Sequence, residues 1–316
     1  MKVVTLAAIT AAALTVWGTA QAQTLGIGST QGGAVGQIAT TLSKIVSTKT
    51  PHQMRSETMG GTQQYIPLVD AGEIQFGLSN LPQYWMAKTG TGMSDKKYEN
   101  LMLAANMMVF TVGPLVANES KLRKVSDFKG KNAPYGFKSA PLFAFITEGV
   151  LANAGLTYDD VKRIPAAGLP QHWGSLKEGK IDFAIAAIGS GAISEMNASI
   201  PGGVRFVSLD NSPEATKRLD AVYPKAYLKQ VEPAPNLVGI TEPVYTLHYD
   251  FLLWTNNKVS DEVVYNVVKA IYESEAELRE SSPLWRSHAS ATMAKDHDTP
   301  YHPGAIKFYK EVGLLK

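Results

Sequence analysis

Residues 24–33 read TLGIGSTQGG, and residues 34–46 read AVGQIATTLSKIV. The first segment begins with an apolar strand, Thr24–Gly28, and ends in a glycine-rich turn. In the second segment apolar residues recur at helical spacing and predict one buried helix face, made of Val35, Ile38, Ala39, Leu42, Ile45 and Val46. A strand that passes through a tight turn into an amphipathic helix is the building unit of α/β folds, so this stretch decides the fold class.

The same alternation of strands and helices continues along the chain. Further strands are predicted at 54–58, 74–78, 132–137, 161–166, 181–188 and 204–209. Helices are predicted at 63–71, 142–154, between 166 and Gly179, from Ser260 through Ile271, and at 303–312. This order predicts sheets, parallel or mixed, that are covered by flanking helices.

Two long apolar segments divide the chain into lobes. They lie at 101–116, where Gly113-Pro114 predicts a break, and at 246–256. The chain is expected to leave one lobe, build a second, and return, with the two crossings acting as a two-strand hinge. We therefore predict lobe I at 23–112 plus 248–316 and lobe II at 113–247.

The first 22 residues have the pattern of a secretory signal peptide. Met1-Lys2 is basic, Val3–Gly18 is apolar, and Ala20-Gln21-Ala22 forms a cleavage site before Gln23. An uncleaved membrane anchor is the alternative. No later segment approaches the roughly 20 apolar residues that span a bilayer, so the mature chain is not expected to cross one. An exported protein of this kind fits the periplasm.

Composition excludes several classes of site. The 316 residues include no cysteine, which excludes disulfides and thiolate metal centres. Lysine and arginine number 30 against 28 acidic residues, and this balance gives no reason to expect nucleic acid as a partner. No motif for a catalytic triad elbow, a metalloprotease or a phosphate loop is present, and the spacing of Gly26, Gly28 and Gly32 does not fit a dinucleotide fingerprint. We expect no cofactor, no metal and no catalytic residue; His297 and His302 are weak candidates for metal ligands.

Four junctions between a strand and a helix are built of small residues, with serine or threonine in all four and glycine in three. They are Gly28–Gly33, Met59–Thr62, Lys138–Pro141 and Gly189–Gly191. Helix N-termini at such junctions present free N–H groups, so four of them can hold one small anion, although each is also an ordinary place for a capping residue. The candidate ligand-binding residues are Ser29, Thr30, Gln31, Gly32, Gly33, Gly60, Gly61, Thr62, Asn80, Ser139, Gln171, Gly189 and Ser190.

Five other residues have two interpretations. Arg55 and Arg163 are either a clamp for a carboxylate or solvated strand ends. Trp173, Tyr245 and His248 either line the cleft or pack in the core. The sequence leaves both alternatives open.

An ordered set of segments resembles the solute-binding subunits of TAXI-type TRAP transporters. The segments are 27–33 (IGSTQGG), 56–62 (SETMGGT), 70–78 (DAGEIQFGL), 125–131 (VSDFKGK), 176–184 (LKEGKIDFA) and 300–310 (PYHPGAIKFYK). The resemblance implies a type II periplasmic binding protein that closes on a small organic carboxylate, such as glutamate or 2-oxoglutarate, and delivers it to TRAP membrane permease subunits driven by an ion gradient.

Two departures from this family bear on the ligand. Ala34-Val35 stands where many relatives carry tyrosine, and Ser139-Ala140-Pro141 stands where many carry a Gly-Ser-Gly-Thr turn, with Phe143 close behind. We therefore expect a less polar pocket and a carboxylate with an apolar or aromatic body. Alternatives are an exported serine hydrolase, the binding subunit of an ABC or tricarboxylate importer, and a periplasmic sensor.

Overall fold

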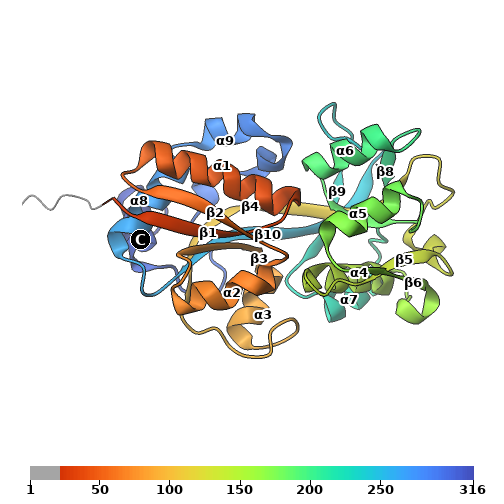
Figure 1. The fold of residues 1–316 in the computed structure, drawn as a ribbon, viewed down its shortest axis with the longest axis horizontal. Coiled ribbons are helices and arrows are strands. Elements are labelled where there is room, and N and C mark those ends of the chain that lie inside the picture. The colour runs from red at the N-terminus through yellow and green to blue at the C-terminus, as the bar shows by residue number, and fades with distance from the viewer. Residues whose placement is uncertain (1–21) are drawn as a thin grey trace, which may run out of the picture.

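The computed structural model describes residues 22–316 and shows two lobes joined by long strands (Figure 1). Almost all of the predicted signal peptide lies outside the described residues. The main sheet has eight strands in the order β2-β1-β3-β10-β4-β7, with β8 paired to β4 and β9 paired to β10. Within residues 22–316 no helix is long and apolar enough to cross a membrane.

The first lobe begins with the strand–turn–helix units predicted from the sequence. β1 (Thr24–Thr30) runs parallel to β2 (Gln53–Met59) and β3 (Phe76–Asn80). α1 (Gly33–Lys49) lies on one side of these strands, and α2 (Thr62–Ala71) and α3 (Leu81–Thr89) on the other (Figure 1). The C-terminal helices complete this lobe; they are α8 (Asp261–Tyr272), α9 (Glu275–Ser281) and α10 (Pro303–Glu311).

Two antiparallel strands connect the lobes. β4 (Leu101–Ala117) and β10 (Val244–Asn256) run side by side from the first lobe into the second (Figure 1). The predicted break at Gly113-Pro114 is wrong, because β4 continues through both residues. The fixed φ of proline suits an extended strand, and the carbonyl of Pro114 still accepts a hydrogen bond from the backbone N–H of Val207.

The second lobe is built around the far ends of these strands. β7 (Ala184–Ala187), β8 (Val204–Phe206) and β9 (Tyr227–Val231) pair with them, and β5 (Asn132–Gly136) and β6 (Lys162–Ala166) form a separate parallel pair. Four helices cover this lobe: α4 (Pro141–Asn153), α5 (Leu169–Lys177), α6 (Gly191–Ser199) and α7 (Pro213–Val222). The boundaries predicted for the lobes stay a prediction.

A buried tryptophan fixes the end of β3 that faces the second lobe. The ring of Trp254 packs so closely over Gly77 that a Cβ there would overlap it. The indole N–H of Trp254 donates to the hydroxyl of Ser79 at 3.0 Å. Because this tryptophan comes from β10, packing between distant parts of the chain positions Ser79 and the neighbouring Asn80.

Candidate functional site

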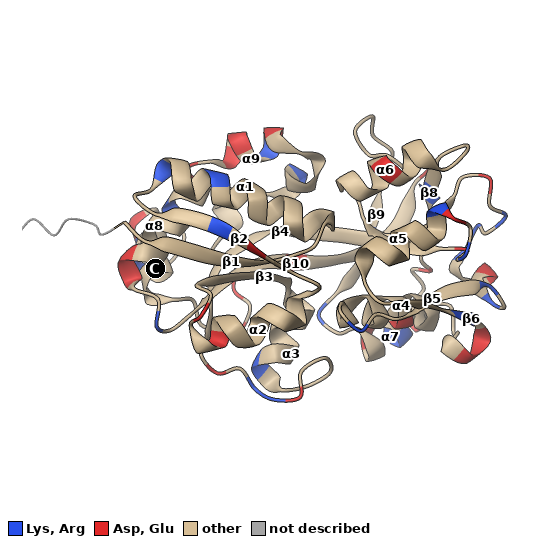
Figure 2. Cartoon of the chain, viewed as in Figure 1, with Lys and Arg blue, Asp and Glu red and all other residues tan. Residues whose placement is uncertain are grey.

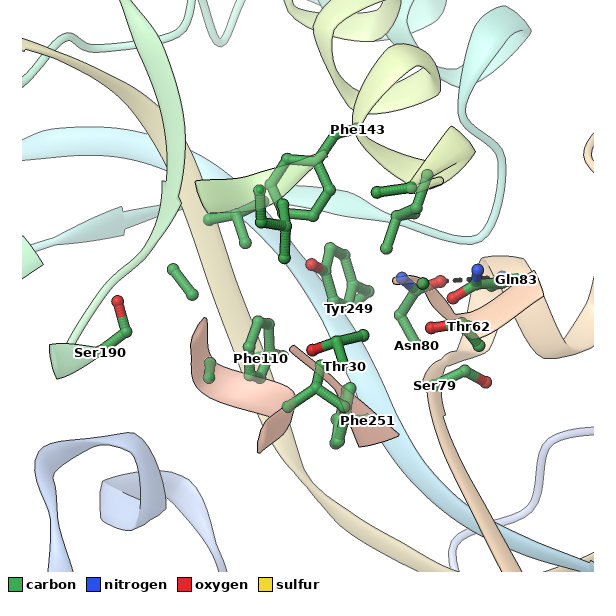
Figure 3. A pocket seen from close by; sticks show the side chains of 18 of the residues that line it. Thr30, Thr62, Ser79, Asn80, Gln83, Phe110, Phe143, Ser190, Tyr249 and Phe251 are labelled. Carbon is green, nitrogen blue, oxygen red and sulfur yellow. Dashed lines mark hydrogen bonds between the residues drawn. The ribbon is translucent and has the colours of Figure 1, made fainter. Parts of the chain in front are cut away.

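A pocket lies between the lobes and draws its walls from both (Figure 3). The lining residues are Thr30, Ala34, Val35, Gly61, Thr62, Ser79, Asn80, Gln83, Phe110, Val112, Ala140, Pro141, Leu142, Phe143, Leu169, Trp173, Ala187, Ser190, Tyr249 and Phe251. This set contains no acidic residue, lysine, arginine or histidine, and most charged residues lie toward the outside of the two lobes (Figure 2).

Aromatic rings form the middle of the pocket. Phe110 of β4 stacks on Tyr249 and Phe251 of β10, with ring centroids 5.8 and 4.9 Å apart. Residues 249 and 251 share one face of their strand because side chains alternate along it. Phe143 of α4 lies across the pocket from Phe251 (Figure 3). These rings favour a ligand with an apolar or aromatic body.

Five helices begin at the pocket, and in none of them does the side chain of the N-cap residue accept a hydrogen bond from the first turn. Their N-cap residues are Gly32 of α1, Gly61 of α2, Ala140 of α4, Gly168 of α5 and Ser190 of α6. An uncapped first turn leaves backbone N–H groups without an intrahelical partner, and the helix dipole adds partial positive charge there. The pocket therefore attracts an anion without a cationic side chain.

The two lobes touch across the cleft, so this is a closed conformation. A Cβ at Gly61 of the first lobe would overlap the carbonyl oxygen of Ser139 in the second. A Cβ at Gly33 would lie 2.8 Å from the ring of Trp173. The side-chain oxygen of Gln37 also accepts a long hydrogen bond, 3.5 Å, from the N–H of Gly191. Glycine at these positions permits the close approach of the lobes.

The candidate residues from the sequence divide into two groups. Thr30, Gly61, Thr62, Asn80 and Ser190 line the pocket. Gly32 and Gly33 line a neighbouring groove between α1 and α5, Gly189 borders a groove beside α6, and Ser29, Gln31, Gly60, Ser139 and Gln171 lie at the same junctions without lining the pocket.

Three of the candidate side chains that do not line the pocket make hydrogen bonds within their own turns or to the neighbouring strand. The hydroxyl of Ser29 pairs with that of Ser56 at 2.7 Å. The hydroxyl of Ser139 donates to the carbonyl of Ala167 at 2.7 Å, and the side-chain oxygen of Gln171 accepts from the N–H of the same residue at 2.7 Å. These side chains hold the turns together.

Of the five residues with two interpretations, one lines the pocket and four do not. Trp173 lines the pocket, and its indole N–H donates to the carbonyl of Ile185 at 3.1 Å. Arg163 forms an ion pair with Asp159, away from the pocket. Arg55, Tyr245 and His248 are also outside the lining. His248 stacks on Tyr227 instead, and burial lowers its pKa to about 4.

His172 lies beneath the pocket in the core. Its ring meets Phe137 and Phe143 edge-on, with centroids 5.1 and 5.9 Å apart. Its Nε2 accepts a hydrogen bond from the N–H of Ile185 at 3.1 Å, so the proton of the neutral ring is on Nδ1. Burial lowers the pKa of His172 to about 3. The residue is therefore neutral at pH 7.

Within the described part of the chain, two polar atoms at the pocket are buried without a hydrogen-bond partner. One is the hydroxyl of Ser190, a residue 2% exposed, and the other is the side-chain oxygen of Gln83, which is 1% exposed. An unsatisfied buried polar atom costs free energy unless a ligand or water meets it. Sequence reasoning missed the hinge-strand aromatics, because it searched the strand–helix turns and not the strands that cross between lobes. It also missed Ser79 and Gln83, which flank the candidate Asn80 at the turn between β3 and α3.

The arrangement offers binding and no acid–base pair. In the described part of the chain, no serine or threonine hydroxyl hydrogen-bonds to a histidine ring, and no group of three or more histidine and acidic residues is placed to hold a metal ion. His297 and His302 lie near Asp250 and Asp261, respectively.

Comparison with known proteins gives a family and a fold. The sequence matches the NMT1-like family over residues 27–313. Three similar solved structures are a periplasmic transporter (13% identity, covering 92% of this chain and 93% of that one, TM-score 0.56), MatC from Rhodopseudomonas palustris with bound malate (14%, 80% and 84%, 0.54), and PhnD1 from Prochlorococcus marinus with methylphosphonate (12%, 92% and 99%, 0.53). The predicted two-lobed α/β fold of a periplasmic binding protein is confirmed; at these identities the similarity extends to the fold alone.

Proposed function

This chain belongs to the NMT1-like family, and we propose that it is a periplasmic solute-binding protein that captures a small organic carboxylate with an apolar or aromatic body. It holds the ligand and breaks no bond. The structures of MatC with malate and PhnD1 with methylphosphonate, both organic anions, support an anionic ligand.

One observation carries the proposal. Five uncapped helix N-termini from both lobes surround a pocket whose lining contains no charged side chain. Backbone N–H groups and helix dipoles supply the only positive potential there, which suits a single carboxylate. The stacked rings of Phe110, Tyr249 and Phe251 supply the apolar contacts.

Closure of the cleft supplies the binding energy. The ligand first meets one lobe, and rotation about β4 and β10 brings the other against it, with lobe I at 23–112 plus 248–316 and lobe II at 113–247. A ligand favours the closed form only through contacts that the open form lacks. A micromolar dissociation constant corresponds to about −8 kcal/mol, which a few charge-assisted hydrogen bonds of roughly 1.5–3 kcal/mol each can largely provide.

The partner is a membrane permease. The resemblance to TAXI-type subunits supports a TRAP permease, which an ion gradient drives, and residues 1–22 supply the export signal to the periplasm. An ABC importer is the second candidate. Uptake by cells that express the protein with its permease should collapse with the ion gradient; uptake that depends on ATP alone would contradict the TRAP assignment.

A thermal-shift screen tests the ligand class. At a hundredfold excess over the dissociation constant, a ligand such as 4-methylbenzoate or hexanoate should raise the melting temperature by about 5 °C or more. The uncharged amides of the same acids serve as controls and should have no effect. Stabilisation by glutamate alone would refute the apolar body, and no response to any acid would refute the proposed function.

A further inference from the structure

Two glutamine side chains at one end of the pocket form a fixed chain of hydrogen bonds. Gln63 Nε2 donates to the carbonyl of Met93 at 2.8 Å, so the Oε1 of Gln63 must be its free acceptor. Gln83 Nε2 donates to that oxygen at 3.2 Å. The orientation of the Gln83 amide is thereby set, and its Oε1 remains buried without a partner. This end of the pocket therefore holds one unused acceptor.

Asn80 adds an unused donor beside it. The Oδ1 of Asn80 accepts from the backbone N–H of Gln83 at 2.8 Å and caps α3. That bond fixes the amide, and its Nδ2 has no hydrogen-bond partner among residues 22–316. Both residues line the pocket and lie next to each other (Figure 3). A ligand group at this position meets a donor and an acceptor together.

From this pair we infer that the ligand carries, at the end opposite its carboxylate, an uncharged group that both donates and accepts a hydrogen bond: a carboxamide or a hydroxyl. The inference rests on the proposed function. A second carboxylate would place an anionic oxygen against Gln83 Oε1, and an ammonium would leave Asn80 Nδ2 without an acceptor. A methyl group would leave both polar groups unsatisfied.

The carboxylate belongs at the other end of the pocket. Ser190 lies well away from Asn80 and Gln83 in Figure 3, with Phe110 and Tyr249 between them. Its buried hydroxyl has no partner and stands at the uncapped start of α6. A ligand that spans the two ends thus has an anionic head, an apolar middle and an uncharged polar tail.

Isothermal titration calorimetry with matched acids tests this inference. The aromatic probes are 4-carbamoylbenzoate, 4-(hydroxymethyl)benzoate, 4-methylbenzoate and terephthalate; the aliphatic probes are adipamate, 6-hydroxyhexanoate, hexanoate and adipate. The amide or hydroxyl member of one series should bind about tenfold or more tightly than its methyl and dicarboxylate analogues. Equal affinity across a series that binds would overturn the inference and leave the proposed function standing; a protein that binds no acid in either series would overturn both.

Variants assign the selectivity to the two residues. Asn80→Asp keeps the cap of α3 and replaces the donor with an acceptor, so it should lose about tenfold in affinity for the amide probe and gain affinity for 4-(aminomethyl)benzoate. Asn197→Asp is the matched control, because Asn197 also accepts a backbone N–H, from Val204, but is exposed and does not line the pocket. It should leave the selectivity unchanged.

Gln83→Met provides a second variant of similar size. It removes the buried acceptor, so it should bind the methyl probe at least as tightly as the wild type does and lose the preference for the amide or hydroxyl. Selectivity that survives in both Asn80→Asp and Gln83→Met would overturn the inference.

Discussion

Helices that begin at the pocket differ from helices that begin on the outside of the molecule. α7, α8 and α10 start at Ser212, Ser260 and His302, and each of these side chains accepts a hydrogen bond from the first turn. At the pocket, the N-cap residues of α1, α2, α4, α5 and α6 accept no such bond, although the N–H of Gly191 in α6 makes a long contact of 3.5 Å with the side-chain oxygen of Gln37. α9, which has no side-chain cap either, carries Glu275 and Glu277 in its first turn. The outer helices are satisfied by the protein itself, whereas the inner ones keep their N–H groups for a ligand.

α3 stands between the two classes. It begins at the pocket, yet Asn80 caps it. One oxygen of this residue serves the helix while the nitrogen of the same amide faces the pocket. A cap can therefore stabilise a helix and take part in recognition at once.

The largest expected effect comes from blocking the contact between the inner helix starts. Gly61→Val places a side chain against the carbonyl of Ser139 and should oppose closure by about 3 kcal/mol, which weakens ligand binding on the order of a hundredfold. Calorimetry with the ligand found in the screen measures this. Gly174→Ala in α5 is the control, because a Cβ there meets no atom within 4 Å, and should bind normally. Normal affinity in Gly61→Val would show that the closed cleft is not the binding conformation.

Two histidines near helix starts make the stability of the protein depend on pH, and they test the difference between inner and outer helices. Burial lowers the pKa of both His172, in the first turn of α5, and His302, the cap of α10, where Asp261 partly offsets the shift. The pKa of His172 is about 3 in the folded state and 6.5 in the unfolded state. As the pH falls, the ring therefore takes up a proton in the unfolded chain and not in the folded one, which favours unfolding. Stability is therefore lost as pH falls below about 6.5, by about 2 kcal/mol at pH 5.

Urea unfolding at pH 7 and pH 5 checks this dependence. His172→Gln removes the titrating ring. Between pH 7 and pH 5 its free energy of unfolding should therefore fall by about 2 kcal/mol less than that of the wild type. His302→Asn keeps a capping side chain and should change the dependence less. Parallel pH profiles for the wild type and His172→Gln would contradict the assignment.

The smallest expected effects come from a pair of serines at helix N-caps. Ser260→Ala removes a cap that accepts from the N–H of Val263, and should cost about 1 kcal/mol of stability without altering affinity. Ser190→Ala removes a hydroxyl that has no hydrogen-bond partner among residues 22–316, so it should leave stability unchanged or higher and weaken ligand binding about tenfold. The opposite pattern, with Ser190 needed for stability and not for affinity, would remove the distinction between inner and outer helix starts.

Much of the fold followed from local patterns. The strand at Thr24–Gly28, its helix and the strand–helix turns were predicted because apolar period and glycine placement are local properties. α3, α7 and α9 were not predicted, and α6 was predicted only as the helix that follows the junction Gly189–Gly191. α3 is short and buried on several sides, so its apolar residues mark no single face, and α6 buries only Ile193 and Met196, too few to show a helical period.

The site was harder to predict than the fold. Thr62 lines the pocket and Ser139 does not, although both belong to strand–helix turns of small residues. The hydroxyl of Ser139 instead donates to the carbonyl of Ala167, a residue 28 positions away. No sequence pattern marks Gln83 as a ligand-binding residue. Its free acceptor results from the amide orientation that Gln63 and Met93 impose.

The sequence by itself determined the alternation of strands and helices, the two crossings between lobes and the glycine-rich turns, because each depends on neighbours along the chain. Tertiary structure alone decided which turns meet, which aromatic rings from β4 and β10 fill the space between them, and which amide atoms remain free. The physical reason is that these outcomes depend on packing between residues far apart in the chain, such as Trp254 against Gly77 and Ser79, and no local pattern encodes such contacts.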